Sequence, residues 1–150
     1  MHAIFVVLAM VSAPPQLESP VLSAEQAQTQ LEGTWVFVDA EEKGKKVPQR
    51  ENAKGLRELK WVFRGDKLAL RKGDEGKEFE YRVDPAKSPK EIDLTLSFGG
   101  EKPVSALAIY KLEEKTLTIC LGDKQGTTRP QDFKTAPGSQ FAIIVLRRAE

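Results

Sequence analysis

Hydrophobic and polar residues alternate along most of the chain after Thr34. An alternation with a period of two residues is typical of β-strands that bury one face and expose the other. The pattern predicts strands at residues 34–38, 59–64, 67–71, 78–83, 92–98 and 116–121. Residues 104–110 and 141–146 are apolar on both faces, so we expect two further strands that are covered on the outside as well.

A short helix is predicted just before the first strand. Ser23 and Gln26 have the spacing of an N-terminal capping box, and Gly33 is a residue typical of a helix end. One side of this helix carries Ala24, Ala27 and Leu31. Because so short a helix is not stable alone, we expect it to dock on the strands, where it is the candidate cover for the two strands that are apolar on both faces.

The breaks between strands carry turn residues. Gly65-Asp66 predicts a tight hairpin, residues 73–76 a longer one, and residues 113–115 a polar reversal. The proline-containing residues 84–89 form a connection that is not a strand. Eight strands at short spacing without crossover helices predict an antiparallel meander, which either closes as a barrel or packs as a sandwich.

Two long segments are not predicted as strands. Residues 41–58 are polar and include a candidate helical turn at 52–56, and residues 122–140 hold three glycines and two prolines. Loops of more than about 12–15 residues without regular structure are uncommon in compact domains unless they carry function or are mobile. We therefore expect any function carried by loops to lie in these two segments.

The first residues differ in composition from the rest of the chain. Residues 3–13 carry no charge and have the length of a signal-peptide core, which is too short to cross a bilayer of about 30 Å. Small residues place candidate cleavage sites after Ala13 and Ala24. We expect residues 1–24 to be a signal peptide and linker, residues 25–150 to form one domain, and the protein to be secreted or periplasmic. The alternative is that the apolar run is a buried first strand.

The amino-acid composition limits the partners and the kinds of functional site that we expect. The 150-residue chain carries 23 Lys and Arg against 22 Asp and Glu, a formal net charge of +1. So balanced a charge predicts no nucleic-acid partner and, once a signal peptide is removed, no stable membrane insertion. His2 and Cys120 are the single histidine and the single cysteine, and His2 lies in the expected signal peptide.

These two counts exclude several kinds of site. A Ser-His-Asp or Cys-His nucleophile pair, the common zinc sites and an intramolecular disulfide all need residues that the mature chain would lack. We therefore expect no metal, no cofactor and no enzymatic activity. Cys120 is interpreted as a small buried hydrophobe.

Several aromatic residues occupy strand positions that point to one face. They are Trp35, Phe37, Trp61, Phe63, Phe79, Tyr81 and Phe98. These side chains either line a cavity for a small apolar ligand or fill the interior themselves, and close packing of such large residues favours a filled core. The main prediction for function is a binding module for a small ligand. The alternative is a structural or protein-interaction module of the cell envelope, with an envelope protein as its partner.

The candidate ligand-binding residues are Arg129, Phe133, Trp61 and Tyr81. Trp61 and Tyr81 belong to the inward aromatic set, whereas Arg129 and Phe133 lie in the long segment 122–140 and are expected at the mouth of the barrel. The alternative for this segment is that Phe133 plugs the barrel while Arg129 hydrogen-bonds the backbone of the loop.

Gly33-Thr34-Trp35, preceded by a short helix, resembles the opening motif of lipocalins. In that fold the tryptophan plugs one end of the barrel and a basic residue of the last strand packs across it, which implies Arg147 or Arg148 here. Further segments are similar to an uncharacterised lipocalin-like domain family expanded in planctomycete bacteria: residues 63–67, 84–85, 89–94, 109–110, 117–120, 129–133 (Arg-Pro-x-x-Phe) and 137–139. The resemblance implies export and an all-β, eight-stranded antiparallel barrel with a short N-terminal helix, but it brings no assigned activity.

Overall fold

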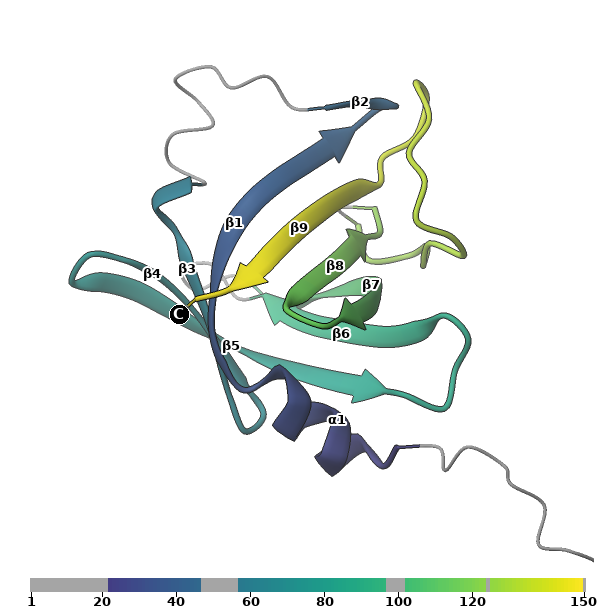
Figure 1. The fold of residues 1–150 in the computed structure, drawn as a ribbon. Helices are drawn as coiled ribbons and strands as arrows, with labels where there is room; N and C mark the ends of the chain where they lie inside the picture. Colours follow the sequence, from purple (N-terminus) through teal and green to yellow (C-terminus); the bar gives the residue numbers. More distant parts are fainter. Residues whose placement is uncertain (1–21, 47–56, 97–101, 124, 150) are drawn as a thin grey trace, which may run out of the picture.

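The computed structural model describes residues 22–46, 57–96, 102–123 and 125–149. Within these ranges, an N-terminal helix precedes nine strands (Figure 1). The helix is α1 (Ala24–Leu31), and the strands are β1 (Gly33–Glu42), β2 (Lys45–Lys46), β3 (Lys60–Arg64), β4 (Lys67–Lys72), β5 (Glu75–Asp84), β6 (Lys90–Leu96), β7 (Val104–Glu113), β8 (Thr116–Leu121) and β9 (Ala142–Arg148).

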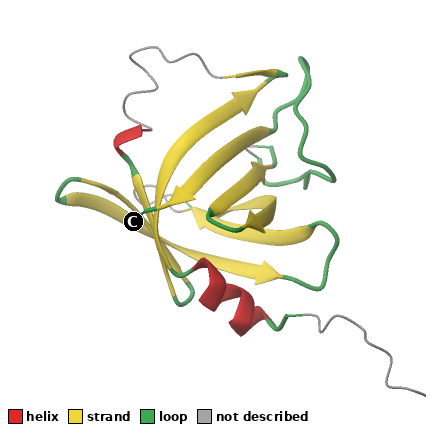
Figure 2. Cartoon of the chain, viewed as in Figure 1, coloured by secondary structure: helices red, strands yellow, loops and turns green. Residues whose placement is uncertain are grey.

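Each strand pair of the described residues is antiparallel, and β3 to β9 follow one another around the sheet. β1 pairs with β3 on one side and with β9 on the other, so eight strands close into a barrel, while β2 adds a short ladder to the end of β1 (Figures 1 and 2). The predicted all-β fold class is confirmed. Of the two architectures that the sequence left undecided, the barrel and the sandwich, the chain forms the barrel. A register shift between Phe37 and Asp39 marks a bulge in β1, and Val38 at this point is 50% exposed.

The capping box predicted for α1 is present. The Gln26 backbone N–H donates to the Ser23 hydroxyl at 3.1 Å, and the Ser23 N–H donates to the Gln26 side-chain oxygen at 3.0 Å. Ala27 and Leu31 are buried, Ala24 is exposed, and the helix packs against β3 and β5. The expectation that α1 covers the outside of β7 and β9 is therefore wrong, and a different segment takes that place.

The turns form largely as predicted. Gly65-Asp66 makes a tight hairpin, and residues 113–115 contain the polar reversal. The hairpin expected at residues 73–76 is shorter than predicted, because residues 72 and 75 are paired and only the two residues between them form the turn. Its flanking strands are correspondingly longer than the alternation indicated.

The polar segment 41–58 begins inside the sheet instead of in a loop. Residues 41–42 continue β1 and pair with β2, which corrects the prediction that the strand ends before them. The helical turn expected at 52–56 lies outside the described residues, as do the expected signal-peptide residues 1–21 and Phe98.

Large side chains fill the end of the barrel beside α1. Phe63 and Tyr81 are each 1% exposed, and their rings meet edge to face with 5.1 Å between centroids. The Tyr81 hydroxyl donates to the Gly65 carbonyl at 2.7 Å, and burial raises the pKa of Tyr81 to about 12. The hydroxyl therefore stays protonated and keeps this structural hydrogen bond at neutral pH.

Trp35 closes this filled end and is fully buried. Its indole N–H donates to the Leu31 carbonyl at 2.8 Å, and the guanidinium carbon of Arg148 lies 4.3 Å from the ring centroid. Arg148 also donates to the carbonyls of Gln30 and Glu32, both at 2.7 Å, where α1 ends. The arginine thus joins the last strand to the plug and to the helix, because it satisfies carbonyls that have no partner inside the helix.

Of the two arginines predicted to pack across Trp35, Arg148 is the one that does so. Arg148 lies over Trp35, whereas Arg147 alternates to the outside of β9 and is exposed. Gly33 is required next to them for two reasons. Its φ of 127° is one that residues with a Cβ rarely adopt, and a Cβ at this position would lie 2.8 Å from a guanidinium nitrogen of Arg148.

Replacing Trp35 with alanine should destabilise the fold by about 3–5 kcal/mol, because a fully buried ring is removed together with its hydrogen bond and its cation–π contact. Urea unfolding followed by circular dichroism measures this change. Val38→Ala is the control on the same strand, and since that side chain is half exposed, its effect should stay within about 0.5 kcal/mol. A Trp35→Ala protein as stable as the parent would show that Trp35 is not the plug.

Candidate functional site

The half of the barrel away from α1 is hollow and contains a cavity of about 940 Å³. Its wall is formed by Leu59, Trp61, Leu68, Leu70, Phe79, Leu94, Val104, Ala106 and Leu121. Its rim is formed by Lys72, Glu75, Gly76, Lys77, Gly122 and Asp123. The filled core favoured by the sequence is therefore present beside α1, whereas the described side chains leave space at the opposite end.

A small residue at an inward position helps to explain the cavity. Ala106, which lines the cavity, is the register partner of Leu94 across β6 and β7. An eight-stranded barrel has room for one small ligand when its inward side chains do not fill it. At this end of the barrel, Trp61 and Phe79 share the wall with the small side chain of Ala106.

The charged side chains of the cavity lining are confined to the rim. Lys72 forms an ion pair with Glu58 at 3.1 Å. Asp123 accepts hydrogen bonds from the Thr127 hydroxyl and from the backbone N–H groups of Thr127 at 2.8 Å and Thr128 at 3.0 Å. These bonds, the hydroxyl bond foremost, lower the pKa of Asp123, so the carboxylate stays ionised and orders the loop at the rim.

The structure separates the two aromatic residues predicted to bind a ligand. Trp61 lines the cavity and is 6% exposed. Tyr81 is 1% exposed in the filled end and is bonded to Gly65, so it is a structural residue and does not line the cavity. The sequence did not single out Leu70, Ala106 or Leu121. Their alternation marks them as inward, but alternation carries no signal for which end of the barrel an inward residue occupies.

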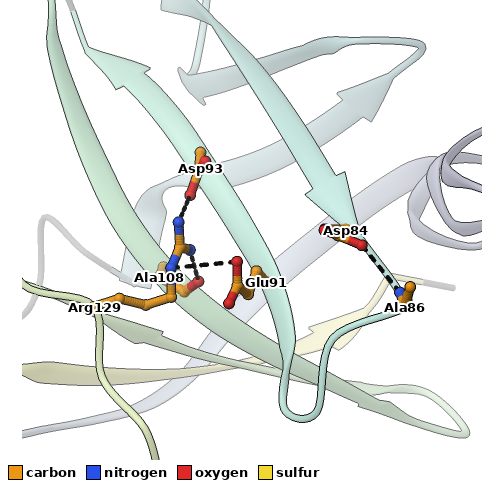
Figure 3. A network of polar contacts seen from close by, with 6 residues as sticks. All are labelled: Asp84, Ala86, Glu91, Asp93, Ala108 and Arg129. Atoms are coloured by element: carbon orange, nitrogen blue, oxygen red, sulfur yellow. Dashed lines mark hydrogen bonds and ion pairs between the residues drawn. The ribbon is translucent and has the colours of Figure 1, made fainter.

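Arg129 lies on the outer wall of the barrel and not at its mouth, which corrects the prediction. Its guanidinium donates to the Ala108 carbonyl at 2.7 Å and forms ion pairs with Asp93 at 2.7 Å and Glu91 at 3.5 Å (Figure 3). Both carboxylates alternate with the buried residues of β6 and therefore face outward. The alternative prediction was that Arg129 hydrogen-bonds the backbone of its own loop. Arg129 does bond a backbone carbonyl, but that carbonyl belongs to Ala108 on β7.

Phe133 belongs to a cover over the outside of β7, β8 and β9, which we call the strap (residues 125–141). Phe133 and Phe141 pack over an outer cluster of buried side chains. The residues of this cluster are Ile109, Cys120 and Ile143. The strap explains why residues 104–110 and 141–146 are apolar on both faces. Phe133 is thus neither at the mouth nor a plug of the barrel, and both interpretations of it are corrected.

Cys120 lies beneath the strap and has no solvent exposure. Burial raises the pKa of its thiol to about 11. The thiol is therefore almost entirely protonated at neutral pH, and the protonated form is a poor nucleophile. This environment agrees with the interpretation of Cys120 as a small buried hydrophobe.

No protein-family model, no curated protein and no solved structure matches this chain. The similarity to the planctomycete lipocalin-like family therefore stays a prediction from its sequence segments. In the described part of the chain, no helix is long and apolar enough to cross a membrane. The same residues contain no group of three or more His, Cys, Asp or Glu side chains placed to hold a metal ion.

Replacing Arg129 with alanine should loosen the strap, because the ion pairs to β6 and the hydrogen bond to β7 are lost together. We expect a disulfide reagent at pH 8 to label Cys120 about tenfold faster than in the parent protein. Lys134→Ala removes an exposed cation from the same strap and serves as the control. Equal labelling rates in all three proteins would show that Arg129 does not hold the strap in place.

Proposed function

We propose that this protein is an extracytoplasmic, non-enzymatic binding module of lipocalin-like type, whose barrel holds a small apolar molecule. The observation that carries this proposal is the cavity of about 940 Å³, since small-molecule sites typically measure about 300–1,000 Å³. Burial of apolar surface against its wall would supply the driving force, at about 25 cal/mol per Å².

The distribution of charge around the cavity favours one orientation of the ligand. The apolar part would enter between Trp61, Leu70 and Phe79, and a polar end would remain at the rim. The rim carries both signs of charge, from Lys72, Glu75, Lys77 and Asp123. This mixture favours an uncharged or zwitterionic polar end over a strongly anionic one.

The alternative function, a structural or protein-interaction module of the cell envelope, was motivated by a filled interior. Large side chains fill the barrel beside α1, but the opposite end is hollow. The hollow end therefore favours the binding module over this alternative.

Ala106→Phe should weaken binding of an apolar probe by about tenfold or more, because the added ring would occupy part of the cavity. The probe is N-phenylnaphthylamine, an uncharged fluorophore that brightens in apolar surroundings. Ser105→Phe is the matched control, since this neighbouring residue is exposed and alternates to the outside of β7. We expect the control to bind the probe like the parent protein.

Two results would contradict the cavity as the binding site. One is a parent protein that shows no saturable fluorescence increase. The other is an Ala106→Phe protein that is folded by circular dichroism and still binds the probe like the parent. Leu121→Trp, which also adds bulk to the wall, provides a second variant if Ala106→Phe does not fold.

The cap of α1 favours one of the two candidate cleavage sites of the proposed signal peptide over the other. Cleavage after Ala24 would remove the cap residue Ser23 and the first residue of α1, and loss of a cap costs about 1 kcal/mol. Cleavage after Ala13 would leave the helix intact. We expect the exported protein to begin before Ser23, as measured by mass spectrometry of its N-terminal peptide. A chain that begins at Glu25 would contradict this expectation, and one that retains Met1 would contradict export.

A further inference from the structure

The outer wall of the barrel carries a groove of about 420 Å³ over β3 and β4, on the opposite side of these strands from the cavity. We call it the basic groove. Its cations are Lys60, Arg64, Lys67 and Arg71. Val62 and Ala69 form its partly buried floor, and Thr34 and Glu78 contribute to its edge.

The four cations face one another in two like-charged pairs. Lys60 is the register partner of Arg71, and Arg64 is the register partner of Lys67. Like charges directly opposite each other in a sheet are destabilising. The isolated fold therefore gains nothing from this arrangement, whereas a partner that supplies negative charge would remove its cost.

Carboxylates of the chain offset this charge in part. Glu80 pairs with Lys67 at 2.8 Å. The partner of Arg71 on β5 is Gly76, so on that side no cross-strand side chain screens the guanidinium. Within the described residues, no ion pair is formed by Lys60, Arg64 or Arg71.

We propose that the basic groove binds an extended acidic segment of a partner protein. Lys60 and Arg64 are four residues apart on β3, which corresponds to about 13 Å at the rise of a strand. An extended segment with carboxylates at positions i and i+4 presents them on one face at the same spacing, one towards the Lys60–Arg71 pair and one towards Arg64. A small apolar side chain at i+2 would then rest on Val62 and Ala69.

The test is fluorescence anisotropy of the full chain with a labelled peptide of sequence Ser-Glu-Ser-Val-Ser-Glu-Ser. We expect saturable binding that weakens with added salt. The double variant Arg64→Glu, Arg71→Glu should weaken it by about tenfold or more. The control is Lys87→Glu, Lys134→Glu, which reverses two exposed cations, one in the turn before β6 and one in the strap outside β7 to β9, and should change the affinity by less than about twofold.

Two further comparisons separate recognition from general charge attraction and from misfolding. A peptide of the same composition with its glutamates three residues apart should bind more weakly, because an extended chain then presents them on opposite faces. Lys60→Glu turns a like-charged cross-strand pair into an oppositely charged one. It should therefore raise the urea midpoint while it weakens peptide binding.

Four results would each overturn the proposal. They are the absence of saturable binding at physiological ionic strength, equal binding of the two peptides, an unchanged affinity of the Arg64→Glu, Arg71→Glu protein, and binding to phosphatidylglycerol vesicles in place of the peptide. The basic groove and the cavity lie on opposite sides of β3 and β4, so failure here leaves the proposed binding module untouched.

Discussion

The contact between Trp35 and Arg148 lies where the ladder of β1 and β9 closes the barrel, and three parts of the chain meet there. Trp35 is the register partner of Trp61 on β3 and of Arg148 on β9, so it lies where β1 joins the two ends of the meander. Its indole N–H binds a carbonyl of α1, and Arg148 covers the ring while it donates to two further carbonyls at the same helix end. A single contact therefore links the first strand, the last strand and the helix. It lies at the filled end of the barrel, opposite the end that contains the cavity.

The pattern of apolar residues was sufficient to predict the eight strands of the barrel, but it predicted neither the short β2 nor the volume of the cavity that the strands enclose. Alternation decides which face of a strand is buried, and eight such strands gave the barrel as one of two architectures. The height of an inward residue along the barrel depends on the register of all the strands together. Trp61 and Tyr81 are both inward aromatic residues, yet register places Trp61 at the cavity and Tyr81 in the filled end. Alanines such as Ala106 decide the volume, and a single sequence gives them no distinguishing signal.

The strap over the outside of β7, β8 and β9 shows a second limit of prediction from the sequence. Strands that are apolar on both faces correctly indicated that something lies over them, but the only regular element left to assign was α1. The strap has no hydrophobic periodicity, so its path could not be derived from a pattern. Arg129 finds Asp93 and Glu91 because the strap returns across β7 to β6, and a pairing so distant in sequence follows from the fold and not from residue spacing.

Two outward-facing charge clusters among the described residues differ in how far the rest of the chain neutralises them. On β6, the carboxylates of Glu91 and Asp93 are neutralised by an arginine of the strap. On β3 and β4, the cations lie opposite one another, and Glu80 relieves one of the four. Excess charge is therefore not a general property of this exterior, since the chain compensates one cluster and leaves the other largely exposed. The proposed ligand and the proposed acidic partner would thus occupy opposite faces of the same strands, and neither would have to displace the other.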